Sequence, residues 1–471
     1  MSSLADATPP IALGPLDGRY RGAVAPLIDH LSEPALNRTR THVEVEWLIH
    51  LTDRQVVPGV RRLTSEETRR LRAVVDEFDS DAIAELAETE RVTQHDVKAV
   101  EYFLKRRLAE IAPTAEDAGL AELIHFCCTS EDINNISYAL MVQGAVARVW
   151  LPRARALVAS VEEMARDLRA VPLLAHTHGQ PATPTTLGKE LAVLAFRLDR
   201  QLRRIEEAEF LGKLNGATGT FGAHLAAVPG ADWPTVSREF VEGLGLTWNP
   251  LTTQIESHDW QAELYADLAR FNRILHNLCT DVWTYISMGY FAQVRGQGTV
   301  GSSTMPHKVN PIRFENAEAN LEVSNALFDV LSSTLVSSRL QRDLTDSSMQ
   351  RNIGTAFGHS LLAIDNVQRG LAGLDAVPEA MAADLEANWE VLGEPVQSAM
   401  RALAAQGVPG MEEPYERLKE LTRGRRIGRD DLVGFVRSLG LPADVEQRLV
   451  TLTPQTYVGL APDLVDYLDR G

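Results

Sequence analysis

The chain has 471 residues, of which 45% are hydrophobic, enough to fill a core larger than that of one ordinary domain. Its net charge of −18 argues against a nucleic-acid surface or an anionic membrane as partner, so any anion must bind in a local pocket. Its three cysteines, Cys127, Cys128 and Cys279, have neither an even count nor a paired ligand spacing, so neither a disulfide framework nor a zinc ribbon is indicated.

Targeting signals are not evident in the sequence. The first ten residues lack a basic region followed by an apolar run. No stretch of about 18 apolar residues occurs elsewhere, as a membrane helix would require. We therefore expect a soluble, cytoplasmic protein.

Helical periodicity dominates the chain, so we predict an all-α fold with a central bundle of long helices. Breaks near Pro113–Gly119 and Gly370–Pro378 suggest three domains. The prediction is an N-terminal helical domain (1–116), a central long-helix domain (117–369) and a C-terminal helical domain (370–471).

Apolar residues spaced by three and four predict three long helices. One runs from Ile133 to about Leu168, with a kink at Pro152, and the others cover Leu187–Ile205 and Leu264–Ile286. Helices of this length suggest a bundle that is shared between subunits.

Polar residues stand at two predicted helix starts. Thr93 is expected to cap a helix whose first turn holds His95 and Asp96, after Gln94, and Thr129-Ser130 precedes a second helix in the same way. Free N–H groups at such ends can bind an anion. Taken singly, each is more simply an ordinary N-cap.

A third polar block contains His176-Thr177-His178, and we predict another helix start there. No acidic residue or third histidine stands nearby at ligand spacing, so a metal site is disfavoured. His178 is better read as an acid, because imidazole titrates near neutrality and can protonate a leaving nitrogen.

The most informative stretch is Gly301-Ser302-Ser303-Thr304-Met305-Pro306-His307-Lys308-Val309-Asn310-Pro311. Glycines precede it, and Asn310 with Pro311 is a good helix start, before apolar residues at Leu321, Phe328, Leu331 and Leu335. Lys308 beside free helix N–H groups would stabilise an alkoxide, so Ser302 or Ser303 could act as a base. By composition alone the stretch could also be a surface linker.

Arginines gather around Asp343-Leu344-Thr345-Asp346. A charged helix corner would explain them, but arginine forks also suit phosphate. The set comprises Arg339, Arg342 and Arg351, with Ser347 between the last two.

The Gly-Ser-Ser…Met-Pro…Lys…Asn stretch, with Glu315 beyond it, resembles the signature of the fumarase/aspartase superfamily. His307 and the Asn-Pro-Ile that follows are most similar to the adenylosuccinate lyases. The Thr-Ser, His-Asp and Thr-x-His-Gly-Gln blocks match the family's other blocks, although Gln94 stands where Asn is common. The match runs from about Asp17 to beyond Arg351.

The resemblance implies β-elimination that releases fumarate from adenylosuccinate and from the succinyl-carboxamide ribotide (SAICAR), giving AMP and AICAR. It implies Ser302 as base, His178 as acid and Glu315 as the partner that supports His178. The substrate contacts that it implies are Arg19, Tyr20, Gln94, His95, Asp96, Thr129, Ser130, Gln254, Lys308, Asn310, Arg342, Ser347 and Arg351.

It further implies a homotetramer with shared active sites, small-molecule substrates, no metal and no organic cofactor. Two alternatives remain: another fumarate-releasing lyase, such as argininosuccinate lyase, and a non-catalytic helical scaffold.

Overall fold

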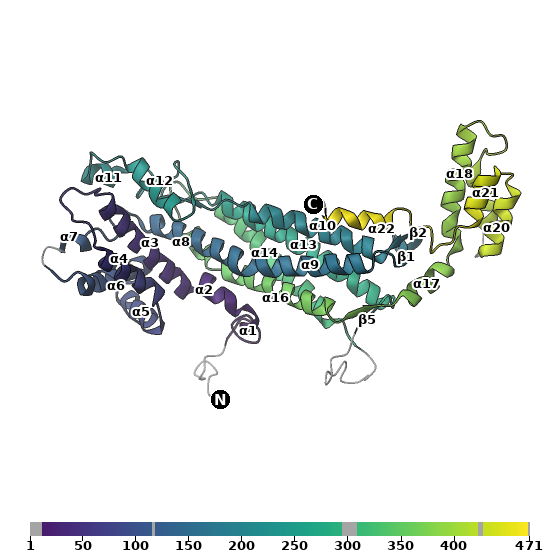
Figure 1. Ribbon diagram of the computed structural model, residues 1–471. Coiled ribbons are helices and arrows are strands. Elements are labelled where there is room, and N and C mark those ends of the chain that lie inside the picture. The colour runs from purple at the N-terminus through teal and green to yellow at the C-terminus, as the bar shows by residue number, and fades with distance from the viewer. Residues whose placement is uncertain (1–11, 115–117, 294–308, 423–426, 470–471) are drawn as a thin grey trace, which may run out of the picture. The chain divides into compact units, whose positions relative to one another are not determined.

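The computed structural model describes residues 12–114, 118–293, 309–422 and 427–469. Helices make up most of these residues and the strands are few and short, which confirms the all-α prediction (Figure 1). Within these four ranges, no helix is both long enough and apolar enough to cross a membrane.

The chain forms two compact units that alternate along the sequence. The first unit consists of Met1–Ala154, Gln201–Arg273 and Ala319–Asp365, and the second of Arg155–Arg200, Ile274–Glu318 and Asn366–Gly471. The division into three domains stays a prediction.

Five long helices contribute residues to both units. They are α9 (Leu151–Asp167), α10 (Leu187–Glu206), α13 (Asp259–Ser287), α14 (Ile312–Leu335) and α16 (Ile353–Leu371). The remaining elements of the first unit are α1 (Arg21–Val24), η2 (Ala25–Leu27), α2 (Ile28–Leu31), α3 (Glu33–Asp53), α4 (Ser65–Asp76), α5 (Ser80–Thr93), α6 (Asp96–Ile111), α7 (Ala118–Ala121), α8 (Ser130–Ala145), the π-helical segment η4 (Val146–Trp150), β3 (Leu211–Gly212), α11 (Gly222–Ala227), α12 (Trp233–Gly243), β4 (Thr247–Trp248) and α15 (Thr345–Gln350). Those of the second unit are β1 (Pro172–Thr177), β2 (Gln180–Thr186), β5 (Phe291–Gln293), β6 (Leu374–Ala376), α17 (Pro378–Glu386), η5 (Trp389–Leu392), α18 (Gly393–Ala405), α19 (Pro414–Thr422), α20 (Arg429–Ser438), α21 (Ala443–Val450), α22 (Ala461–Leu464) and η6 (Val465–Asp469).

The helices predicted from apolar spacing are confirmed. Helices α10 and α13 cover the predicted ranges. The four apolar residues predicted for α14 are each at most 1% exposed. Helix α14 begins at Ile312, one residue after the predicted start, and the Glu315 N–H donates to the Pro311 carbonyl (3.3 Å).

The predicted helix around Pro152 is interrupted by a change of helix type. Helix α8 runs into the π-helical segment, and α9 continues from Leu151. Proline has no N–H to donate, and its ring crowds the carbonyl four residues earlier. The wider π turn immediately before Pro152 is a recognised way to accommodate this.

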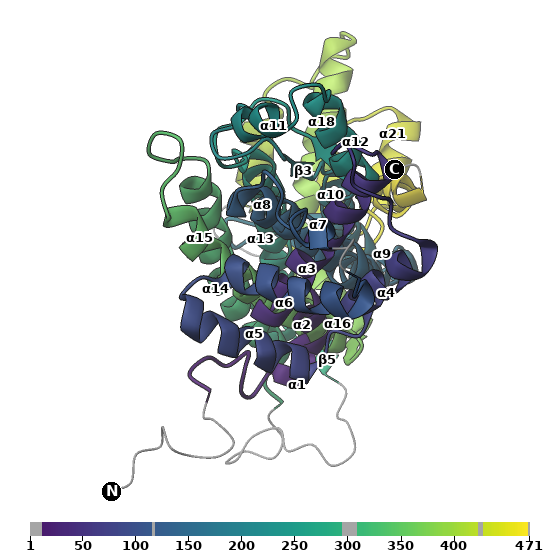
Figure 2. The same cartoon turned by 90° about the vertical axis from the view of Figure 1, so that its left-hand side faces the viewer.

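In the first unit, α3 packs beside α8, and α5 packs beside α6 (Figure 2). A buried polar network ties its long helices together. Trp150 Nε1 donates to Ser360 Oγ (2.9 Å), which donates to Asn272 Oδ1 (2.9 Å). Asn272 Nδ2 donates to Ser324 Oγ (3.1 Å) and Asn325 Oδ1 (3.0 Å).

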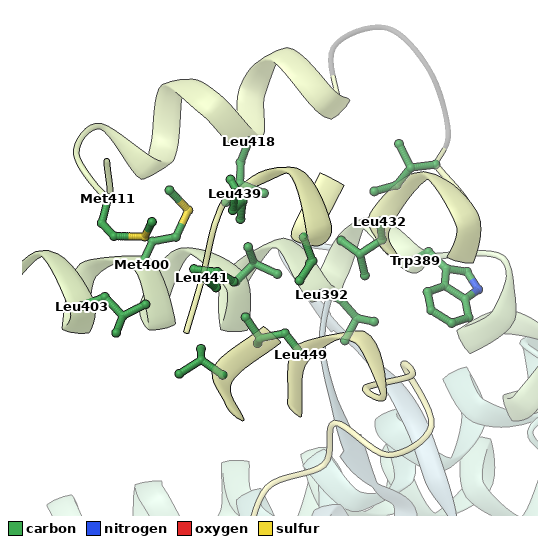
Figure 3. Packing of buried hydrophobic residues seen from close by; sticks show 14 residues of the cluster. Trp389, Leu392, Met400, Leu403, Met411, Leu418, Leu432, Leu439, Leu441 and Leu449 are labelled. Carbon is green, nitrogen blue, oxygen red and sulfur yellow. The ribbon is translucent and has the colours of Figure 1, made fainter. Parts of the chain in front are cut away.

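In the second unit, β1 and β2 form an antiparallel hairpin, and β5 pairs antiparallel with β6. The C-terminal helices enclose an apolar cluster of their own (Figure 3). Its members include Trp389, Met400 and Leu449, each at most 4% exposed.

Candidate active site

Helix α8 starts as predicted, with Thr129 at its N-cap and Ser130 as its first residue. The Thr129 N–H donates to Asp132 Oδ2 (2.8 Å), which fixes the turn that leads into the helix. Both Thr129 and Ser130 are half-buried. This end therefore combines hydroxyl groups with the positive end of a helix, which suits a carboxylate.

Asp132 also holds a second loop against α8. Its Oδ1 pairs with Lys213 Nζ (2.8 Å) and accepts from the Asn215 N–H (3.0 Å). The side chains of both Asp132 and Lys213 are fully buried. Because a buried charge needs a partner, this ion pair fixes the start of the glycine-containing loop that follows Lys213.

Helix α6 starts two residues later than the Thr93 cap predicted. Thr93 is the last residue of α5, and His95 is the N-cap of α6, with its Nδ1 accepting from the Lys98 N–H (3.3 Å). Gln94 lies between them in the left-handed region (φ 55°). The chain therefore turns at Gln94, between the end of α5 and the start of α6, so His95 and not Thr93 caps α6.

Asp96 is the first residue of α6 and binds two arginines. Its Oδ2 lies 2.8 Å from Arg40 Nη2 and 3.3 Å from Arg351 Nη2. Burial alone would raise the pKa of Asp96, but Arg40 and Arg351 lower it below its usual value. Asp96 is therefore an anion that holds Arg351, which also contacts Glu33.

A second arginine is held in a similar way by a neighbouring carboxylate. Arg342 Nη2 lies 2.9 Å from Glu131 Oε1, and Arg342 Nη1 donates to Gln254 Oε1 (3.4 Å). Asn134 Nδ2 also donates to Glu131 Oε1 (2.8 Å), and Arg40 Nε donates to Asn134 Oδ1 (2.9 Å).

These contacts form one continuous polar network in the first unit. It brings together four residues expected at the site, Asp96, Gln254, Arg342 and Arg351, which come from three segments that are far apart in sequence. A cavity of about 110 Å³ borders the network and is lined by Ser32, Tyr138 and Arg351 among others.

Ser347, Arg19 and Tyr20 are expected substrate contacts that also belong to the first unit. Ser347 belongs to α15, and its N–H donates to Asp346 Oδ1 (2.6 Å). Arg19 and Tyr20 immediately precede α1, with the Arg19 guanidinium 5.9 Å from the Tyr20 ring centre.

His178 lies in the second unit, on a hairpin and not at the helix start predicted for it. It occupies the two-residue turn between β1 and β2 with Gly179, and both have positive φ (54° and 72°). Such a turn matches the twist of a hairpin, but a non-glycine residue there is uncommon. His178 is exposed at this hairpin tip, where an acid can reach a ligand.

Glu315 and Asn310 also belong to the second unit. Glu315 is exposed in the first turn of α14 and accepts a hydrogen bond from Trp283 Nε1 (3.1 Å). Its pairing with His178 stays a prediction. Asn310 is half-buried just before α14, whereas Ser302, Ser303 and Lys308 lie outside the described residues.

Several residues that organise the site were not predicted. Arg40, Glu131 and Lys213 are buried charged groups whose partners are distant in sequence. Asp132 could have been predicted from the sequence, because Thr129-x-x-Asp132 has the spacing of a capping box. The buried Glu44 was also missed; its Oε1 contacts His125 Nδ1 (2.6 Å) and holds the loop before Thr129.

Comparisons with protein families match nearly the whole chain. Residues 18–323 match the family described as "Lyase", and residues 338–458 match "Adenylosuccinate lyase C-terminal". An adenylosuccinate lyase of Escherichia coli (strain K12) is 47% identical, covering 97% of this chain and 98% of its own. That of Vibrio cholerae is 46% identical with the same two coverages.

Solved structures with low sequence identity share the fold. A fumarate lyase from Mesorhizobium sp. BNC1 has a TM-score of 0.75 at 19% identity, covering 95% of this chain and 98% of that one. The β-carboxy-cis,cis-muconate cycloisomerase of Acinetobacter calcoaceticus has a TM-score of 0.71 at 18% identity and the same coverages.

Proposed function

The chain belongs to the adenylosuccinate lyases of the fumarase/aspartase superfamily, and from that membership we propose how its residues carry out the reaction. It cleaves a C–N bond of adenylosuccinate by β-elimination and releases fumarate and AMP. The same elimination converts SAICAR to AICAR, because both substrates carry a succinyl group on nitrogen.

In this reaction Ser302 removes the proton from the succinyl carbon next to the carboxylate. Lys308 and Asn310, with the loop N–H groups, stabilise that carboxylate as its negative charge grows. His178 then protonates the departing nitrogen, as imidazole can do near neutral pH. The substrate's own carboxylate accepts the electrons, so the chemistry needs neither a metal nor an organic cofactor.

The nucleotide phosphate binds to Arg342, Ser347 and Arg351, with Arg19, Tyr20 and Gln254 as further contacts. The observation that supports this best is the network joining Arg342 and Gln254 to Arg351 and Asp96. Two guanidinium groups held beside half-buried polar residues suit a phosphate dianion. Gln94, His95, Thr129 and Ser130 contact the succinyl end of the substrate.

The enzyme is a cytoplasmic homotetramer with active sites that are shared between chains. Support comes from apolar residues exposed on the long helices: Val193 and Phe196 on α10, and Val323 and Val330 on α14, each between 36% and 45% exposed. Helices that are apolar on more than one side are expected to be covered by another chain.

An assay of fumarate release from purified protein tests this function. We expect release from adenylosuccinate and from SAICAR, and none from argininosuccinate. Release from argininosuccinate alone would identify the other lyase activity. A folded protein that releases fumarate from none of the three would be a non-catalytic scaffold.

A further inference from the structure

The guanidinium of Arg342 has one buried N–H that is not used by the described residues. Its Nη2 faces Glu131 and its Nη1 faces Gln254, but its Nε has no hydrogen-bond acceptor within the described part of the chain. Buried polar groups in native proteins are nearly always paired. The Nε–H is therefore a buried donor whose acceptor the described residues do not supply.

Glu131 is the charged partner that holds this guanidinium in place. Its side chain is 5% exposed and that of Arg342 is 25% exposed, so solvent screens their attraction only weakly. The same Oε1 atom also accepts from Asn134 Nδ2, which fixes the carboxylate. The position of Arg342 thus depends on Glu131.

A carboxylate so close to a phosphate-binding arginine has a second effect. It neutralises part of the positive charge that attracts a phosphate, and it repels the dianion directly. Positioning and repulsion act on substrate binding with opposite signs, so a single residue can adjust the affinity.

We propose that Glu131 positions Arg342 and at the same time limits its affinity for the substrate phosphate, so that the nucleotide product can leave. This inference rests on the proposed function, in which Arg342 binds the phosphate. Glu131 acts through Arg342 and is a positioning residue, not a catalytic one.

Two substitutions separate the two effects. Glu131→Gln removes the charge but keeps an oxygen that can accept from both Arg342 and Asn134. Glu131→Ala removes the charge and both contacts. We expect Glu131→Gln to lower the Kd for AMP about tenfold and to lower KM, with slower turnover because product release is slowed. Glu131→Ala is expected to raise the Kd, because Arg342 loses its position.

Calorimetric titration with AMP measures these affinities, with fumarate as the ligand that carries no phosphate. Glu33→Gln is the matched control, because Glu33 pairs with Arg351 but is 69% exposed, and screened pairs contribute little. We expect the Kd for AMP to change less than about twofold in that variant.

Weaker or unchanged AMP binding by folded Glu131→Gln would overturn the inference, even if Glu131→Ala fails to fold. An equal change in fumarate affinity would also overturn it. If the wild-type enzyme released no fumarate from adenylosuccinate, the proposed function itself would be wrong, and with it the role of Arg342 in binding phosphate. The wild-type assay therefore distinguishes failure of the proposed function from failure of the inference about Glu131.

Discussion

His178 at the tip of the β1–β2 hairpin and Ser302 have separate tasks in the proposed elimination. We expect His178→Ala and Ser302→Ala each to lower kcat more than about a hundredfold, because a missing general acid or base commonly costs that much. Steady-state fumarate release measures the loss, and circular dichroism confirms that the variants are folded.

The neighbouring serine provides the control. Ser303→Ala should retain most of the turnover, because the proposed base is the first serine of the pair. A Ser302→Ala enzyme with near-normal turnover, together with an inactive Ser303→Ala enzyme, would show that the second serine is the base.

Arg342 and Arg351 bind away from the breaking bond in the proposed complex. Replacing either by Ala should raise KM for adenylosuccinate about 10- to 100-fold, as expected for a lost charged hydrogen bond. kcat should change much less. A fall in kcat at unchanged KM would contradict the assignment of these arginines to the phosphate.

His125 makes the stability of the fold depend on pH. Burial alone would lower its pKa, but the hydrogen bond and charge of Glu44 raise it above the usual value. The contact therefore stabilises the protein fully below about pH 6.5, the pKa of an unfolded histidine, and this contribution is lost as pH rises through the raised pKa.

Urea denaturation of wild type and His125→Asn at several pH values tests this dependence. The difference in unfolding free energy between them should be largest near pH 6 and should shrink toward pH 9. A difference that stays constant with pH would show that the charge of His125 contributes nothing to stability.

Some site residues could be predicted from the sequence because their chemistry is local. Thr129 and Ser130 follow the pattern of a helix cap, and the capping residue is where it was expected. Arg40 and Glu131 could not be predicted in the same way, because the partners of a buried charge depend on which distant segments meet.

The long helices were predictable because each carries a regular apolar stripe. Helices α10 and α13 match the predicted ranges, since burial and helical spacing agree along their whole length. The hairpin around His178 was missed: the stretch is rich in Thr, Pro and His, and its strands are defined by mutual pairing more than by a strong alternation of apolar residues.

Asn272 is the centre of the polar network that joins the helices of the first unit. It is fully buried and bonds to Ser360, Ser324 and Asn325. We expect Asn272→Ala to lower the unfolding free energy by about 2–3 kcal/mol, because it leaves buried partners unpaired. Denaturant titration measures the change.

Asn277 is a half-buried asparagine of the same helix, and it is the matched control for Asn272. Asn277→Ala should change the unfolding free energy by much less, because water can replace its contacts with Arg197 and Asp281. Ala favours a helix more than Asn does, so helix propensity cannot explain a loss in either variant. Equal losses would therefore mean that the buried network around Asn272 contributes no more to stability than the half-buried contacts of Asn277.

At the scale of the whole molecule, the expected site residues are divided between two compact units. His178, Asn310 and Glu315 belong to the second unit, whereas Asp96, Gln254, Arg342 and Arg351 belong to the first. Helices of twenty or more residues span about 30 Å or more, so residues at their ends diverge within one chain and converge across a symmetric interface. The site is therefore expected to form from several chains, with His178 and Ser302 of one site on different chains.

Mixing two inactive variants tests that arrangement. His178→Ala and Ser302→Ala proteins are combined in equal amounts under conditions that dissociate and reassemble the oligomer. If each site takes these two residues from separate chains, random assembly leaves about a quarter of the sites with both residues intact. Fumarate release should then return to about a quarter of the wild-type rate. Each variant taken alone through the same procedure is the control. If hybrid oligomers form, as shown by two affinity tags, but remain inactive, then His178 and Ser302 act from the same chain.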